Sequence, residues 1–142
     1  MSVSEHISPL VGRLIIAWFF LSEAWWRLND WEGTVTLMHM KHISNAHLFL
    51  ALALVVMVLG ALALALGYHT RPGALVLFGF TIIASVSLHN YWKIADSIDR
   101  SADYDLFIRN LAIAGGLLFL VGMGPGPFAL DNTAKGGGKA KR

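Results

Sequence analysis

Four long apolar stretches divide the chain. They run over about 10–28, 47–66, 73–91 and 106–123, each roughly the 18 to 20 residues that an α-helix needs to cross the hydrocarbon core of a bilayer. The second stretch contains LFLALALVVMVLGALALAL and is apolar on every face, which excludes an amphipathic helix of a soluble protein. Polarity does not alternate as it would along the strands of a membrane barrel. The pattern predicts an all-α membrane protein, a bundle of four transmembrane helices.

The connections between the stretches are unequal in length. GYHTRPG predicts a tight hairpin between the second and third helices, with Pro72 at the start of the third. The connections 29–46 and 92–105 are longer and polar, and they lie on the membrane face opposite the termini. Residues 1–131 are therefore expected to form one transmembrane domain, followed by a flexible basic tail over 132–142.

Small residues predict where the helices approach one another. Four of them recur every seven residues along the second helix, at Ala46, Ala53, Gly60 and Gly67. The fourth helix has similar pairs, Ala112 with Gly116 and Gly115 with Gly122. Because helices in membranes pack closely through small side chains, a tight bundle is expected.

Composition narrows the class of protein and of partner. Of the 142 residues, 56% are hydrophobic and 14% are charged, below the roughly 25% of soluble domains. The net charge of +2, without a basic surface patch interleaved with aromatic residues, argues against a nucleic-acid partner. There are no cysteines, which excludes disulfides and thiol chemistry. The first segment has no cleavage signal and is expected to be retained as a helix.

The distribution of positive charge sets the expected orientation. Six Lys and Arg residues lie on the terminal face and five on the opposite face. The positive-inside rule gives a small bias, and the tail KGGGKAKR favours placing both termini in the cytoplasm.

Polar residues gather near the outer ends of three helices. Glu23 and Arg27 are four residues apart on the first helix, so they share a face and can form an ion pair. One interpretation is that they neutralise each other at the interface while the nearby tryptophans form an aromatic belt. The alternative is that they line a wet pocket with His89, Asn90 and Arg109, because ionisable groups within membranes usually face a cavity or the bundle interior.

Such a pocket suits a quinone headgroup. Histidine and arginine side chains could donate hydrogen bonds to its carbonyl oxygens, and a histidine beside a carboxylate could pass protons. Tryptophans such as Trp26 and Trp92 could cover the ring of the bound molecule. Thr81 and Ser85 lie on the same helical face as His89, and their hydroxyls are expected to bond to carbonyls of their own helix.

Other ligands find less support in the sequence. His39 and His42 are three residues apart and are weak candidates for a metal site, but two histidines do not make one. Haem ligation by His89 would need an axial partner from a second helix, and no other predicted span has a histidine at mid-membrane depth. No catalytic triad, phosphate-binding loop or dinucleotide fingerprint is present, so no resident cofactor is expected.

Several short motifs, in order, resemble the DoxX family of small four-helix membrane proteins. GRLIIAWFFLSEAWWRL resembles the family's first helix, with Arg13 at its start and Arg27 at its end. GYHTRPGAL resembles its Gly-x-x-x-Arg turn, here Gly67 and Arg71, and HNYW resembles the end of its third helix. GPGPFALD is similar to the family's closing Gly-Pro-Gly and Leu-Asp pair.

The resemblance implies a multi-pass protein of the bacterial inner membrane. Some DoxX members resemble a membrane subunit of thiosulfate:quinone oxidoreductase, and others accompany terminal oxidases. The implied function is a small subunit of a quinone-linked respiratory or electron-transfer complex that contacts quinone or a partner redox subunit. The alternative is a non-catalytic accessory subunit that stabilises a larger membrane complex and binds lipid. A transporter is a third class, but neither an inverted repeat nor a broken helix supports it.

The predicted ion pair gives a test of stability. If Glu23 and Arg27 form a partly buried pair, Glu23→Gln leaves the arginine without its counter-charge and should lower the melting temperature in detergent. Glu32→Gln, in the polar connection, is the matched control and should have a smaller effect. Equal melting temperatures for the two variants would contradict the pairing.

Overall fold

Four long helices and three short ones make up the described part of the protein. The computed structural model describes residues 3–136, and within that range it contains no β-strand. The elements in order are α1 (Val3–Asn29), α2 (Trp31–Met40), α3 (Ala46–Leu66), α4 (Thr70–Leu88), the 3-10 helix η1 (Tyr91–Lys93), α5 (Ser97–Met123) and α6 (Leu130–Gly136). Helices α1, α3, α4 and α5 are each long and apolar enough to cross a membrane, which confirms the predicted fold class.

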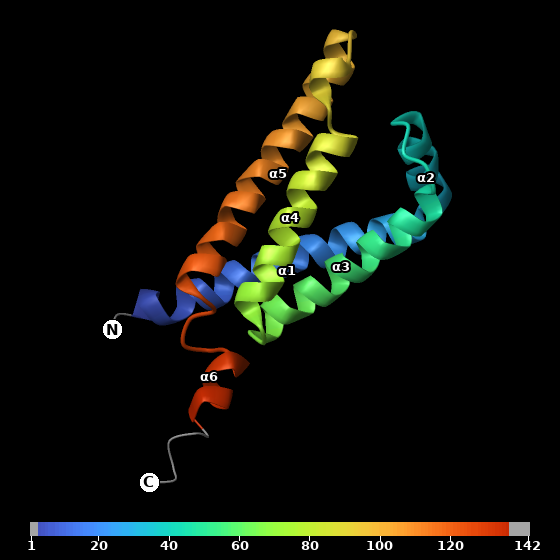
Figure 1. Cartoon of the computed structure of the whole chain (residues 1–142). Helices are drawn as coiled ribbons and strands as arrows, with labels where there is room; N and C mark the ends of the chain where they lie inside the picture. The colour runs from blue at the N-terminus through green and yellow to red at the C-terminus, as the bar shows by residue number, and fades with distance from the viewer. Residues whose placement is uncertain (1–2, 137–142) are drawn as a thin grey trace.

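The four long helices pack as two antiparallel pairs. Helix α1 lies along α3, and α4 lies along α5, while the hairpin between α3 and α4 joins the pairs (Figure 1). From that hairpin the pairs diverge in Figure 1, and Lys41, which follows α2, contacts Asn90 and Asp103 of the other pair at their far ends. The site described below lies between these diverging halves.

Helices α3 and α4 approach each other closely at Gly60. An ideal Cβ on Gly60 would lie 2.6 Å from the Leu77 side chain, so only a glycine allows this approach. Leu77 and Leu64 are fully buried here, within a core to which all four long helices contribute. The predicted small-residue contact is thus confirmed at Gly60. On α5, Gly116 contacts Ile16, but Gly115 and Gly122 face open space.

Helix boundaries differ from the expected spans at several ends. Helix α5 begins at Ser97 instead of near 106, because the Asp96 side chain accepts hydrogen bonds from the amides of Ile98 and Asp99 and caps the helix. The connection expected over 92–105 is therefore short. Helix α1 extends back to Val3, and α4 begins at Thr70, just before Pro72.

The first connection and the tail also contain helices. Helix α2 occupies most of the polar connection between α1 and α3, and its Val35 and Met38 are buried against Ala46 and Leu50 of α3. Helix α6 covers part of the segment predicted to be a flexible tail, while 137–142 lie outside the described residues.

A hydrogen-bonded turn closes the end of the molecule where the chain termini lie. The guanidinium of Arg13, buried in α1, donates to the carbonyl oxygens of Pro125 (2.8 Å) and Phe128, beyond the end of α5. Gly67 has φ +67°, and a Cβ there would meet Ala129 and Arg13. This packing gives Arg13 and Gly67, the two motif residues, a structural role at this end of the molecule.

Asp131 caps α4 from across the chain. Its carboxylate accepts hydrogen bonds from the amides of His69 (2.7 Å) and Thr70 (3.0 Å). Partial burial acts to raise the pKa of Asp131, but the hydrogen bonds from Thr70 and His69 outweigh it, so the pKa lies below its usual value. The ionised carboxylate therefore stabilises the folded state.

The close contact at Gly60 can be tested with a matched pair of substitutions. Gly60→Ala should lower stability by about 1–3 kcal/mol, because the added methyl must displace the buried Leu77. Gly115→Ala adds the same methyl into open space and should leave stability unchanged or slightly raised, since alanine favours helix. Thermal unfolding in detergent measures both; equal shifts would show that α4 does not approach α3 this closely.

The Asp131 cap predicts a pH-dependent loss of stability. Asp131→Asn should cost about 1 kcal/mol near neutral pH, since it weakens a capping interaction. Because the folded-state pKa is lowered, the carboxylate's contribution is complete above its unfolded pKa and is lost as pH falls through the folded one. The difference in melting temperature between wild type and variant should therefore shrink at acidic pH. A constant difference would contradict this role.

Candidate functional site

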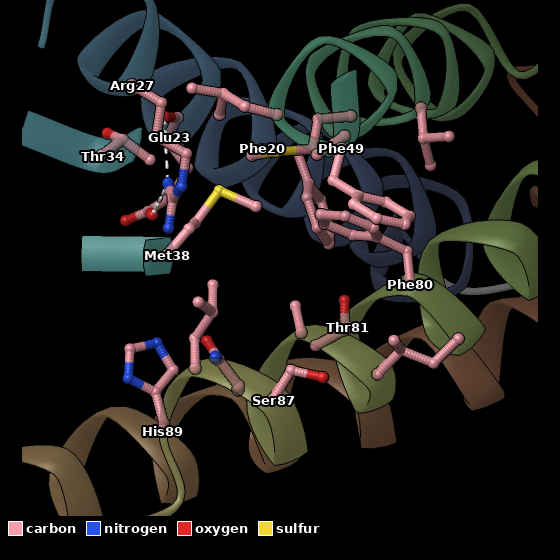
Figure 2. Close-up of a pocket in the computed structure, with 18 of the residues that line it drawn as sticks. Phe20, Glu23, Arg27, Thr34, Met38, Phe49, Phe80, Thr81, Ser87 and His89 are labelled. Carbon is pink, nitrogen blue, oxygen red and sulfur yellow. Dashed lines mark hydrogen bonds and ion pairs between the residues drawn. The ribbon is translucent and has the colours of Figure 1, made fainter. Parts of the chain in front are cut away.

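A cavity of about 400 Å³ lies between the diverging helix pairs. Its walls come from α1, α2, α3, α4 and the middle of α5, so residues far apart in sequence meet there. Figure 2 shows Glu23, Arg27 and His89 toward one end of the cavity and Phe20, Phe49 and Phe80 toward the other. The cavity is therefore amphipathic, with a charged end and an aromatic, apolar end.

Glu23 is shared between two arginines at the charged end. Its Oε2 accepts from Nη1 of Arg27, and its Oε1 lies 3.6 Å from Nη2 of Arg109. The Arg27 side chain also donates to the Glu23 carbonyl oxygen at 3.1 Å. The guanidinium of Arg109 lies 5.3 Å from the centre of the Phe19 ring. Glu23 thus links α1 to α5 across the cavity, and the two arginines keep further N–H groups for a ligand.

A second polar cluster lies beside the first. Nδ1 of His89 lies 3.3 Å from Oδ1 of Asp103, and Nζ of Lys41 lies 2.9 Å from Oδ2 of the same carboxylate. Lys41 also donates to Oδ1 of Asn90 at 3.0 Å. Because Lys41 follows α2 while Asp103 belongs to α5, this cluster also joins the two halves of the molecule.

The hydroxyls of Thr81, which lines the cavity, and of Ser85, one turn further along α4, are bonded within their own helix. Thr81 donates to the Leu77 carbonyl oxygen at 2.7 Å, and Ser85 donates to that of Thr81 at 2.7 Å. This confirms the structural interpretation of both residues. The rest of the wall is mainly apolar, with Met38, Met57 and Leu88 beside the phenylalanines.

The structure brings together most, but not all, of the predicted site. Glu23, Arg27, His89 and Arg109 line the cavity, and the predicted Glu23–Arg27 ion pair is present. Asn90 lies outside the lining and contacts the site through Lys41.

The tryptophans are the main departure from the predicted site. Trp26 is 73% exposed and Trp92 is 50% exposed, and neither lines the cavity. The reason is geometric: Trp26 directly precedes Arg27 on α1 and so points to a different face of the helix. Phenylalanines of α1, α3 and α4 take the place expected of tryptophans.

The histidines of the first connection do not form a cluster with other ligands. His39 is exposed at the end of α2, and His42 is exposed with φ +61° in the turn that follows. Within residues 3–136 no group of three or more His, Asp or Glu side chains could hold a metal ion.

Sequence reasoning missed Asp103, Lys41 and the phenylalanines. Asp103 falls within the connection predicted over 92–105, because the apolar pattern places the start of the fourth helix later than the structure does. The Asp-Ser-Ile-Asp segment over 96–99, a helix-capping pattern, was the available signal. No sequence signal indicated that Lys41 would reach α5.

The arrangement suits binding of an amphiphile more than covalent catalysis. The lining offers cationic donors at one end and aromatic and aliphatic surface at the other, but no nucleophile paired with a base. A molecule with a small polar head and an apolar body would match both ends.

Two family models match the chain. A model described as DoxX matches residues 8–90, and a model of the SURF4 family matches residues 58–136. The DoxX match covers more than half of the chain and includes Glu23, Arg27 and His89.

Relatives of similar length come from Escherichia coli (strain K12). The chain is 28% identical over 131 residues to inner membrane protein YqjF, covering 92% of the chain and 95% of that protein. It is 29% identical over 123 residues to inner membrane protein YphA, covering 86% of each.

A Surfeit locus protein 4 homolog of Drosophila melanogaster is 29% identical over 134 residues, which cover 92% of the chain and 42% of that protein. No solved structure matches the chain.

The family match, the inner-membrane relatives and the four membrane-length helices agree with one another. The chain belongs to the DoxX family and is a multi-pass protein of the bacterial inner membrane.

Proposed function

We propose that this protein is a quinone-binding subunit of an inner-membrane electron-transfer complex. The observation that carries the proposal is the amphipathic cavity, whose charged end gathers Arg27, Arg109 and His89 while its opposite end is lined by phenylalanines. A quinone combines a flat polar head with an apolar tail, so its two parts correspond to the two ends of the cavity.

The charged end suits a head with carbonyl oxygens. Arg27 and Arg109 are fixed by Glu23 yet each retains free N–H groups, and donors to a carbonyl oxygen are strongest when they carry charge. Arg27 is only partly exposed, so water competes weakly for the hydrogen bond that it would donate to a ligand.

The size and position of the cavity suit a ligand from the bilayer. A volume of about 400 Å³ lies in the range of small-molecule pockets. Its apolar end is formed by membrane-spanning helices, at the depth of the lipid tails where a quinone diffuses. In the orientation predicted by the positive-inside rule, with both termini in the cytoplasm, the charged end would face the outer side of the membrane.

A second candidate function is a non-catalytic accessory subunit. The outer face of α5 supports it: Gly115 and Gly122 are exposed, and the Cβ position at each has no neighbouring atom within 4 Å. A helix of a larger complex could approach closely there, because small residues favour helix contacts in membranes. Lipid would then occupy the cavity.

Quinone content of the purified protein tests the proposal. Gentle purification from native membranes should yield quinone bound in roughly stoichiometric amounts, together with redox subunits identified by mass spectrometry. The double variant Arg27→Gln/His89→Gln should retain about tenfold less quinone, since each change removes a polar contact to the head. Quinone is measured by solvent extraction and chromatography.

The control is Arg100→Gln, which removes an exposed arginine near the start of α5 and leaves the cavity unchanged. Thermal unfolding of each variant separates loss of ligand from loss of fold. A complex that keeps its quinone in the double variant would contradict the pocket and favour the accessory role. A protein that purifies with neither quinone nor partners would contradict both.

A further inference from the structure

We infer that the cavity prefers a ligand whose head donates a hydroxyl hydrogen to His89, so that among quinones it selects the reduced, quinol form. This inference rests on the proposed function and names the form of ligand that the same site takes. It follows from the contact that Nδ1 of His89 makes with Asp103.

Asp103 determines which nitrogen of His89 carries a hydrogen. A carboxylate is only an acceptor, so at the 3.3 Å contact between Nδ1 and Oδ1 the imidazole must donate. In a neutral imidazole one nitrogen is a donor and the other an acceptor. With its hydrogen on Nδ1, a neutral His89 has its lone pair on Nε2.

Lys41 keeps Asp103 ionised without a charged histidine. Its ammonium lies 2.9 Å from Oδ2, the oxygen that His89 does not contact. The carboxylate therefore has a counter-charge in Lys41, and the imidazole can remain neutral while it donates from Nδ1. Nζ of Lys41 also donates a hydrogen bond to Oδ1 of Asn90, at 3.0 Å. Asp103 and Lys41 are thus positioning residues for His89.

Nε2 of His89 remains accessible. Among the described residues, two buried polar side-chain atoms lack a hydrogen-bond partner, Arg13 Nε and Thr70 Oγ1. Because Nε2 of His89 is not one of them, it is not sealed inside the protein. His89 lines the cavity, and its ring points toward the charged end in Figure 2. A ligand there meets an acceptor at His89 and donors at Arg27 and Arg109.

This mixture of acceptor and donors distinguishes the two redox forms. A quinone has only carbonyl acceptors and would leave Nε2 facing another lone pair. A quinol has hydroxyl groups that donate to Nε2 and can also accept from an arginine. An unmatched buried acceptor costs about one hydrogen bond, which corresponds to roughly a tenfold preference for the quinol.

Nitrogen NMR of the unmodified protein tests the tautomer directly. Protein labelled with ¹⁵N-histidine in nanodiscs should show His89 with a protonated Nδ1 and an unprotonated Nε2. The chain has six histidines, so the His89 signals are assigned by their loss in His89→Gln. An imidazolium, or the tautomer with hydrogen on Nε2, would overturn the inference without use of any ligand.

Binding of a matched pair of probes tests the preference. Decylubiquinol and decylubiquinone are titrated anaerobically against protein in nanodiscs, with empty nanodiscs as the blank for partition into lipid. The unmodified protein should bind the quinol about tenfold more tightly. Asp103→Asn, whose amide can donate to Nδ1 and move the histidine hydrogen to Nε2, should abolish or reverse that preference. Asp105→Asn, an exposed neighbour on α5, should keep it.

The outcomes separate this inference from the proposed function. Equal affinity for the two probes in the unmodified protein would overturn the quinol preference and leave quinone binding intact. Binding of neither probe would overturn the proposed function and the ligand preference together, while the NMR result still decides the tautomer. An unchanged quinol preference in a folded Asp103→Asn variant would show that Asp103 does not set it.

Discussion

The contact between α3 and α4 at Gly60 and Leu77 determines the shape of the molecule. These two helices are joined by a tight hairpin. At Gly60 they lie so close that a Cβ atom would overlap the Leu77 side chain, so their separation near the hairpin is fixed. Each brings its own partner, α1 or α5, to this point. Beyond it the pairs diverge (Figure 1). The cavity is lined by side chains from both pairs.

Charged residues connect the two halves where apolar packing does not. Glu23 with Arg109, and Lys41 with Asp103, each join an element of the first half to α5. Charges near a hydrocarbon core are costly unless paired, so the carboxylates stabilise the cations beside them as well as orient them. Of these residues, Glu23 and Arg109 also line the cavity. Structural neutralisation and a binding site are therefore compatible in one set of residues.

The opposite end of the molecule is fixed differently. Buried Arg13 bonds to carbonyl oxygens after α5, and Asp131 caps α4. These contacts join α1 and α4 to the segment after α5 and to α6. Motifs shared with the DoxX family occur at both ends, so the resemblance reflects the fold at one end and the candidate site at the other.

The sequence by itself determined the four membrane helices, because their length and uniform apolarity admit no other arrangement in a bilayer. It also determined the Glu23–Arg27 pair and the hydroxyl bonds of Thr81 and Ser85, since helical periodicity alone brings those atoms together. Only the tertiary structure decided that Trp26 faces outward, that phenylalanines line the cavity, and that Lys41 reaches Asp103. Apolar patterns do not distinguish a face toward lipid from one toward a cavity, and contacts between distant segments depend on how the helix pairs cross.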